Sequence, residues 1–261
     1  MSEDLKTKWL STQSEFERRD EFFKLFRSCP IPENEMLANL GLFMNGQALS
    51  RLLFMNELYE NILTVHGSIM EFGVRWGQNL ALWSECRAMY EPYNHNRKII
   101  GFDTFEGFPS VHENDRGFAE TGDYAVISQY EEYLEKILNF HEQENPIPHL
   151  KKYQLVKGDA TVELEKYLKE NPETIISLAY FDFDIYEPTK VCLELIREHL
   201  TRGSIIGFDQ LNRHDFPGET LAVKEVLGLS RYKLVRSRHS RVNCYAIIDL
   251  PIKKISKRAR L

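Results

Sequence analysis

Residues 174–189, Thr-Ile-Ile-Ser-Leu-Ala-Tyr-Phe-Asp-Phe-Asp-Ile-Tyr-Glu-Pro-Thr, decide the fold class of this chain. The apolar first half predicts a buried strand, and the pattern from Pro188 onward predicts a helix. Side chains alternate along a strand, so Asp182 and Asp184 should point the same way from its carboxyl end. Ligands bind at that end of open α/β sheets. Two neighbouring carboxylates there indicate a site that holds a cation or a shared proton. The alternative is a helix N-terminus that acidic residues stabilise.

The same alternation of a strand followed by a helix repeats along the chain. Strands are predicted over 66–72, 98–102, 153–157, 174–181 and 204–208, with helices over 77–90, 128–144, 160–169, 188–199 and 219–227. Two closing strands, 232–236 and 242–248, predict an antiparallel hairpin. This order predicts an α/β fold with a doubly wound, mainly parallel seven-stranded sheet that is covered on both faces.

Two segments stand apart from this alternation. Residues 1–62 have an amphipathic helical pattern, so we expect an N-terminal helical appendage that acts as a lid or dimer contact, followed by one α/β domain over 63–261. The polar stretch 106–122 is longer than an ordinary loop and predicts a lid or binding loop. Its Phe108 and Phe118, together with Phe105, could wall a pocket or simply pack in the core.

The charge balance restricts the partners. There are 33 basic and 39 acidic residues and a net charge of −6, which argues against nucleic acid because phosphate binding needs clustered positive charge. The basic tail 253–260 is the local exception and reads as a solvated terminus. The charged amino terminus and the absence of a long apolar run predict a soluble, cytoplasmic protein without a membrane partner.

Glycines and acids follow three of the predicted strands. The first strand ends Glu71-Phe72-Gly73-Val74-Arg75-Trp76-Gly77-Gln78, whose G-x-x-x-G spacing allows a close backbone approach to a ligand or a simple tight turn. The spacing is not the dinucleotide-binding G-x-G-x-x-G. Asp103 follows the second strand, where an acid commonly binds ribose hydroxyls. Asp159 follows the third, where it could meet an adenine amino group. Either aspartate could instead cap the next helix.

These stretches carry a family resemblance. Residues 71–74, 101–109 (Gly-Phe-Asp-Thr-Phe-Glu-Gly-Phe-Pro), 158–160, 182–189 and 217–225 run in the family's order. The chain resembles a class I S-adenosylmethionine-dependent methyltransferase, and most of all the macrocin O-methyltransferase group. That group methylates sugar or aromatic hydroxyls in macrolide and aminocoumarin antibiotics.

The resemblance implies roles for particular residues. It assigns Glu71 and Gly73 to the methionine end of S-adenosylmethionine, Asp103 to the ribose, and Asp159 with Ala160 to the adenine. Gln78 and Thr104 belong to the same expected cofactor site. Asp182 is the expected magnesium ligand, together with Asp209. Asp184 is the expected general base, with His214 as the alternative.

One departure from the family pattern bears on the metal. The family usually has two adjacent acids after the fifth strand, whereas this chain has Phe208-Asp209-Gln210, so Phe208 stands where the first acid is expected. Magnesium can still bind through one or two carboxylates with water and substrate.

The expected reaction is methyl transfer from S-adenosylmethionine to a hydroxyl of a sugar or sugar-containing metabolite, with nucleotide-linked sugars among the acceptors, and the expected assembly is a homodimer. The sulfonium methyl is already activated, so the enzyme must align it with the acceptor and remove the acceptor's proton. The alternatives are a phenol or phosphorus-linked acceptor, and a nucleotide-binding protein without methyl transfer.

Overall fold

The computed structural model describes residues 11–115 and 118–249, and the basic tail at 253–260 lies outside these ranges. Seven strands form one sheet with the order β3-β2-β1-β4-β5-β7-β6. The strands are β1 (Ser68–Phe72), β2 (Ile99–Asp103), β3 (Tyr153–Lys157), β4 (Ile176–Phe181), β5 (Leu200–Phe208), β6 (Leu234–Arg236) and β7 (Cys244–Ile247). The predicted doubly wound, mainly parallel sheet of seven strands is confirmed.

The first five strands are parallel to one another, and β7 is the strand that runs against them. β7 lies between β5 and β6 and is antiparallel to both, so the predicted closing hairpin is part of the main sheet. The strand order reverses between β1 and β4, which makes their carboxyl ends the switch point where doubly wound folds bind ligands. Phe181 is in register with Phe72 on β1 and with Phe208 on β5. The loops after β1, β4 and β5 therefore leave the sheet at the same level.

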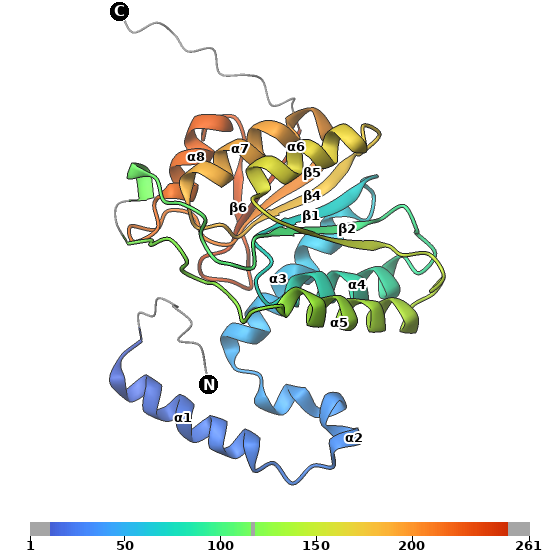
Figure 1. Cartoon of the computed structure of the whole chain (residues 1–261), viewed down its shortest axis with the longest axis vertical. Coiled ribbons are helices and arrows are strands. Elements are labelled where there is room, and N and C mark those ends of the chain that lie inside the picture. The colour runs from blue at the N-terminus through green and yellow to red at the C-terminus, as the bar shows by residue number, and fades with distance from the viewer. Residues whose placement is uncertain (1–10, 116–117, 250–261) are drawn as a thin grey trace, which may run out of the picture.

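Helices cover both faces of the sheet (Figure 1). α6 (Ala160–Glu170), α7 (Tyr186–Ile196) and α8 (Gly218–Val226) pack on one face, and α3 (Gly46–Ile62), α4 (Gln78–Tyr90) and α5 (Tyr130–Glu144) on the other. Short 3-10 turns occur at Leu37–Phe43, Glu113–Asp115 and Arg197–His199. On the first face Phe72, Phe102, Phe181 and Phe208 form a row of stacked rings, with neighbouring centroids 4.7–5.9 Å apart.

This row of rings accounts for Phe208, which occupies the position where the family pattern has its first acid. Phe208 is fully buried and stacks on Phe181, so it is a core residue of β5. The residues that emerge at the rim after β5 are Asp209 and Gln210.

The N-terminal helices divide into two parts. α3 lies in the layer beneath the sheet, with Phe54, Met55 and Leu58 fully buried against it. α1 (Gln13–Arg27) and α2 (Glu33–Met36) project away from the α/β body (Figure 1), and every residue of α1 keeps part of its surface exposed. The expected N-terminal helices are present, and only the part before α3 stands clear of the sheet. Among the described residues, no helix combines the length and apolar character needed to cross a bilayer.

Candidate active site

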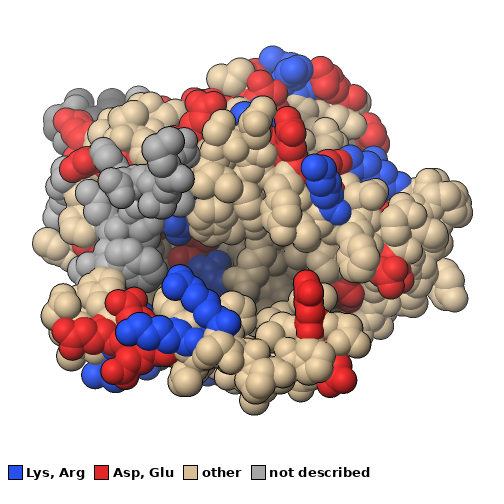
Figure 2. Space-filling view, turned by 60° about the horizontal axis from the view of Figure 1, so that its bottom comes forward, with Lys and Arg blue, Asp and Glu red and all other residues tan. Residues whose placement is uncertain are grey.

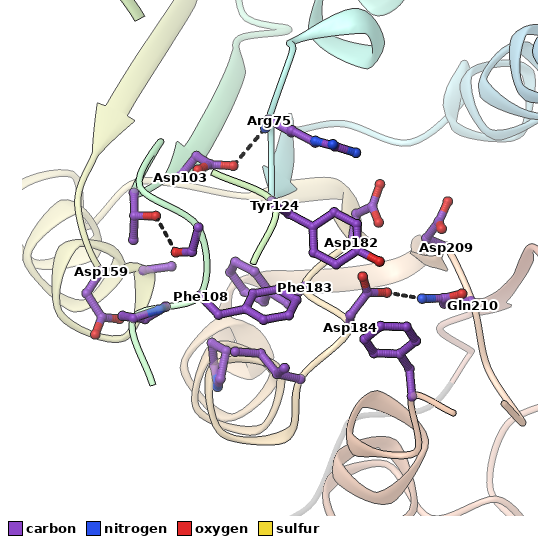
Figure 3. A pocket seen from close by; sticks show the side chains of 18 of the residues that line it. Arg75, Asp103, Phe108, Tyr124, Asp159, Asp182, Phe183, Asp184, Asp209 and Gln210 are labelled. Atoms are coloured by element: carbon purple, nitrogen blue, oxygen red, sulfur yellow. Dashed lines mark hydrogen bonds between the residues drawn. The ribbon is translucent and has the colours of Figure 1, made fainter. Parts of the chain in front are cut away.

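A cavity of about 290 Å³ opens at the carboxyl ends of the parallel strands. It is lined by the loops that follow β1 to β5, and the polar stretch 106–122 contributes Gly107, Phe108, Pro109 and Phe118. Figure 3 shows Asp103 and Asp159 on one side of this cavity and Asp182, Asp184 and Asp209 on the other. The surface between the α/β body and the projecting helices is hollowed, with acidic and basic side chains in its depth (Figure 2).

The turn after β1 is tightly constrained. Gly73 has φ 92°, and a Cβ atom there would lie 2.3 Å from the carbonyl oxygen of Asp182. Only glycine allows the loops after β1 and β4 to cross at this distance. Glu71 is fully buried behind the turn, where it accepts a 2.6 Å hydrogen bond from Asn79 Nδ2, and burial raises its pKa to about 8. Gln78 is exposed at the start of α4.

Asp103 joins two loops at the end of β2. Its Oδ2 accepts hydrogen bonds from the backbone N–H groups of Val74 (2.6 Å) and Arg75 (2.7 Å), and its Oδ1 accepts one from Phe105 N–H (2.6 Å). Burial raises the pKa of Asp103. The hydroxyl of Thr104 donates to the Gly107 carbonyl at 2.7 Å. The expected ribose residue thus lines the cavity and also fixes the shape of its wall.

Asp159 is the N-cap residue of α6, as the structural alternative predicted. Its Oδ1 accepts hydrogen bonds from the backbone N–H (2.9 Å) and the hydroxyl (2.7 Å) of Thr161. Asp159, Gly158 and Ala160 also line the cavity. Capping and ligand binding are compatible here, because both capping bonds use the same carboxylate oxygen.

The acidic end of the cavity is formed by Asp182, Asp184 and Asp209. Asp182 and Asp184 do not come together by the strand alternation that the sequence predicted. β4 ends at Phe181, so Asp182 and Asp184 lie on the following loop, and Asp184 has a left-handed φ of 63°. Both still line the cavity. Burial and the nearby Asp209 charge raise the pKa of Asp182, and the same causes raise the pKa of Asp184 to about 7. The Gln210 amide donates a hydrogen bond to Asp184.

Arg51 of α3 provides the positive charge at this acidic end. Its Nη2 lies 2.6 Å from Asp209 Oδ1 and its Nη1 lies 3.4 Å from Asp182 Oδ2. The Asp209 charge raises the pKa of the guanidinium further above its usual range. Asp209 Oδ1 also accepts hydrogen bonds from the Tyr180 hydroxyl (2.9 Å) and Asn243 Nδ2 (3.0 Å).

Two structures of CalS11 resemble this chain over nearly its whole length. One, described as a calicheamicin methyltransferase, is 41% identical with a TM-score of 0.88, and the match covers 94% of this chain and 99% of that one. The apo structure, described as a TDP-rhamnose 3'-O-methyltransferase, is 39% identical with a TM-score of 0.81, covering 92% and 96%. This chain belongs to the class I S-adenosylmethionine-dependent O-methyltransferases. The O-methyltransferase NovP shares the fold, at 18% identity and a TM-score of 0.61 over 77% and 80% of the two chains. No protein-family model and no curated protein sequence matches the chain.

The acid pair of this methyltransferase does not fit a magnesium ion as it is arranged. Asp182 and Asp209 both contact the Arg51 guanidinium, and Asp209 Oδ1 already has three donors. Across residues 11–115 and 118–249, no group of three or more His, Cys, Asp or Glu side chains is placed to hold a metal. The magnesium expectation therefore lacks support from the geometry.

The loop after β5 also differs from expectation. His214 is exposed to solvent, while its neighbours Arg213 and Asp215 line the cavity and pair with each other, Nε to Oδ1 at 2.9 Å. Four further residues line the cavity without a role predicted from the sequence: Arg51, Arg75, Tyr124 and Arg213. Arg75 lies in the quoted β1 turn and stacks over the Tyr124 ring at 5.0 Å, so a basic residue in a glycine turn was an available signal. Arg51 had no local signal, because its partners lie 131 and 158 positions later.

Proposed function

We propose that this methyltransferase transfers the methyl group of S-adenosylmethionine to a hydroxyl of a nucleotide-linked sugar. The observation that carries the proposal is the 39% identity to a TDP-rhamnose 3'-O-methyltransferase over 96% of that chain. The match also covers 92% of this chain, so it extends well beyond the central strands of the fold.

The cofactor end of the cavity supports a defined orientation. The absence of a side chain at Gly73 would let the methionine portion approach the β1 turn, and Asp103 and Thr104 would meet the ribose. Asp159 and Ala160 would meet the adenine, with Asp159 Oδ2 as the acceptor for its amino group. This orientation would direct the sulfonium methyl group toward the acidic end, where an acceptor could bind in the same cavity.

Asp184 would act as the general base. Attack by an alcohol oxygen requires loss of its proton, and a base works best when its pKa is near the working pH. The pKa of Asp184, raised to about 7 by burial and by Asp209, meets this condition. The Gln210 amide and the left-handed backbone at Asp184 would keep the carboxylate in place.

Three guanidinium groups line the cavity beside its aspartates and could contact an anionic acceptor. Arg51, Arg75 and Arg213 all line it, from α3, the β1 turn and the β5 loop respectively. The diphosphate of a sugar nucleotide carries negative charge that guanidinium groups bind well. A neutral phenol or glycoside would make no use of these guanidinium groups, although Arg51 and Arg213 also pair with acids of the same cavity.

We also propose that α1 and the turn 37–43 bind a second copy of this chain. Phe23 is 56% exposed, Leu25 63%, Leu37 78% and Leu42 62%, which is unusual for large apolar side chains. Within this arm, which consists of α1 and the turn 37–43, the Phe26 ring packs edge-to-face on the Phe43 ring with the centroids 4.8 Å apart. A homodimer would bury these side chains.

A panel of acceptors tests the proposed substrate class. S-adenosylmethionine is supplied with TDP-rhamnose, other nucleotide-linked hexoses, free rhamnose, a rhamnoside and catechol, and methylated product is measured by mass spectrometry. Transfer to nucleotide-linked sugars well above all other acceptors is expected. Preferential transfer to the rhamnoside or catechol would contradict the substrate class, and a thermal shift with NAD rather than S-adenosylhomocysteine would contradict methyl transfer itself.

A further inference from the structure

Two carboxylates meet at adjacent strand ends in this site and need a positive charge between them. Asp182 and Asp209 follow Phe181 and Phe208, which are paired residues of β4 and β5. Their side chains are mostly buried, with 24% and 15% of their surfaces exposed. Buried like charges on neighbouring strand ends repel strongly unless a cation or a proton offsets them.

The Arg51 guanidinium lies where that cation is needed. It contacts Asp209 at 2.6 Å and Asp182 at 3.4 Å with two different nitrogens, so one group bridges both acids. A guanidinium carries five N–H donors in a fixed plane and never loses its charge at physiological pH. The two contacts with Asp182 and Asp209 use two of these donors, and Arg51 also lines the cavity, so a remaining N–H group could reach an acceptor oxygen.

The backbone that carries Arg51 is held firmly. One turn further along α3, Phe54 and Met55 are fully buried, and the Met55 carbonyl accepts a hydrogen bond from Trp83 Nε1 at 3.3 Å. α3 passes so close to β5 that a Cβ atom on Gly207 would lie 3.1 Å from Leu58 Cδ1. On the same helix, Glu57 accepts a 2.6 Å hydrogen bond from the Ser237 hydroxyl. The guanidinium is thus presented by a rigid element.

Asp209 is also held in this arrangement by hydrogen bonds from several donors. Asp209 Oδ1 accepts from Arg51, Tyr180 and Asn243 together. A divalent cation would have to displace the guanidinium and reorganise these donors before it could coordinate that oxygen. Magnesium dehydrates reluctantly and demands near-octahedral oxygen ligands, which adds to this cost.

We propose that Arg51 takes the place of a divalent cation in this enzyme: it balances Asp182 and Asp209, excludes metal from them, and lies beside the acceptor oxygen during methyl transfer. The role in transfer rests on the proposed function, whereas the exclusion of metal does not.

Metal binding tests the exclusion without any acceptor. Free Mn²⁺ is measured by electron paramagnetic resonance in titrations of chelator-treated protein that contains S-adenosylhomocysteine. Wild type and Arg51→Lys should bind no stoichiometric Mn²⁺, and neither should the control Arg202→Met, which removes an exposed arginine at the amino end of β5. Arg51→Met should bind one Mn²⁺ per chain, at least about tenfold more tightly than wild type. Arg51→Met combined with Asp182→Asn should lose that ion.

Turnover provides the second readout. Wild type should keep its full rate with TDP-rhamnose after exhaustive chelation, and Arg51→Met should be slow but accelerated by added Mg²⁺ or Mn²⁺. One Mn²⁺ per wild-type chain, or a wild-type rate that chelation removes and Mg²⁺ restores, would overturn the proposal even if Arg51→Met does not fold. Equal Mn²⁺ affinity in wild type and a folded Arg51→Met would overturn it as well. If no variant methylates any nucleotide-linked sugar while the Mn²⁺ results hold, the proposed substrate fails and the exclusion of metal stands.

Discussion

Asp184→Asn should inactivate the enzyme and stabilise its fold. Asparagine matches aspartate in shape, tolerates the left-handed φ of 63°, and can still accept the Gln210 amide hydrogen bond. The substitution therefore removes the proton acceptor and the buried charge with little other change. Loss of a general base typically lowers the rate by about 10²–10⁴-fold.

The stability effect has a definite size and pH dependence. Folding raises the pKa of Asp184 from its ordinary value of 3.8 to about 7, so the folded state binds a proton that the unfolded state lacks between these values. Stability of the wild type must then fall as the pH rises through that window. The difference corresponds to on the order of 4 kcal/mol above pH 7, at about 1.36 kcal/mol per tenfold change in acidity. Asp184→Asn escapes this cost, and its advantage should shrink below pH 7 and vanish near pH 4.

Urea denaturation of wild type and Asp184→Asn at several pH values measures the free energy of unfolding, and kcat is measured on the same samples. In wild type, kcat should rise with pH through about 7 as Asp184 loses its proton. Ser14→Ala on the exposed face of α1 is a matched control with no expected pH-dependent difference. Near-wild-type turnover in Asp184→Asn, or a stability difference that is the same at pH 5 and pH 8, would refute the assignment of Asp184 as a buried, titrating base.

Three further substitutions test the cofactor wall and the arm. Gly73→Ala should abolish binding of S-adenosylhomocysteine in calorimetric titration and lower the melting temperature, because its Cβ would lie 2.3 Å from the Asp182 carbonyl oxygen; normal affinity would show that the loops can separate. Asp103→Ala should weaken cofactor binding about ten- to a hundredfold, because a charge-assisted hydrogen bond is worth about 1.5–3 kcal/mol and the wall loses its bridge to Val74; unchanged affinity in a folded variant would exclude the role. Phe23→Asp should halve the mass in solution by light scattering, and a mass equal to that of wild type would remove the arm from the dimer contact.

The sheet was predictable because its signals are local. The buried run of β4 and the acids directly after it identify both the central strand and the binding rim, and the glycine and aspartate turns after β1, β2 and β3 occupy the positions that their motifs suggest. A hydrophobic period of two or 3.6 residues, together with glycine or aspartate at the turns, is enough to predict such features from the sequence. The carboxyl ends of parallel strands then meet at one edge without further information.

The residues that escaped prediction depend on contacts between distant segments. Arg51 looks like any polar residue of an amphipathic helix until α3 packs beneath β4 and β5 and brings it to Asp209. The loop-fixing role of Asp103 likewise depends on backbone N–H groups of Val74 and Arg75, which lie 29 and 28 positions earlier. Phe208 could be placed in the core rather than at the rim only from the register of β5 against β4.

The proposed reaction passes a methyl group from S-adenosylmethionine to a sugar hydroxyl within this one cavity, with Asp184 as the base. The most direct measurement is transfer of an isotopically labelled methyl group to TDP-rhamnose, followed by mass spectrometry and by nuclear magnetic resonance of the product, for wild type and Asp184→Asn. One labelled methyl on a sugar oxygen is expected with wild type, and at least about a hundredfold less product with Asp184→Asn. Label on another group of the molecule, or equal product from both proteins, would contradict it.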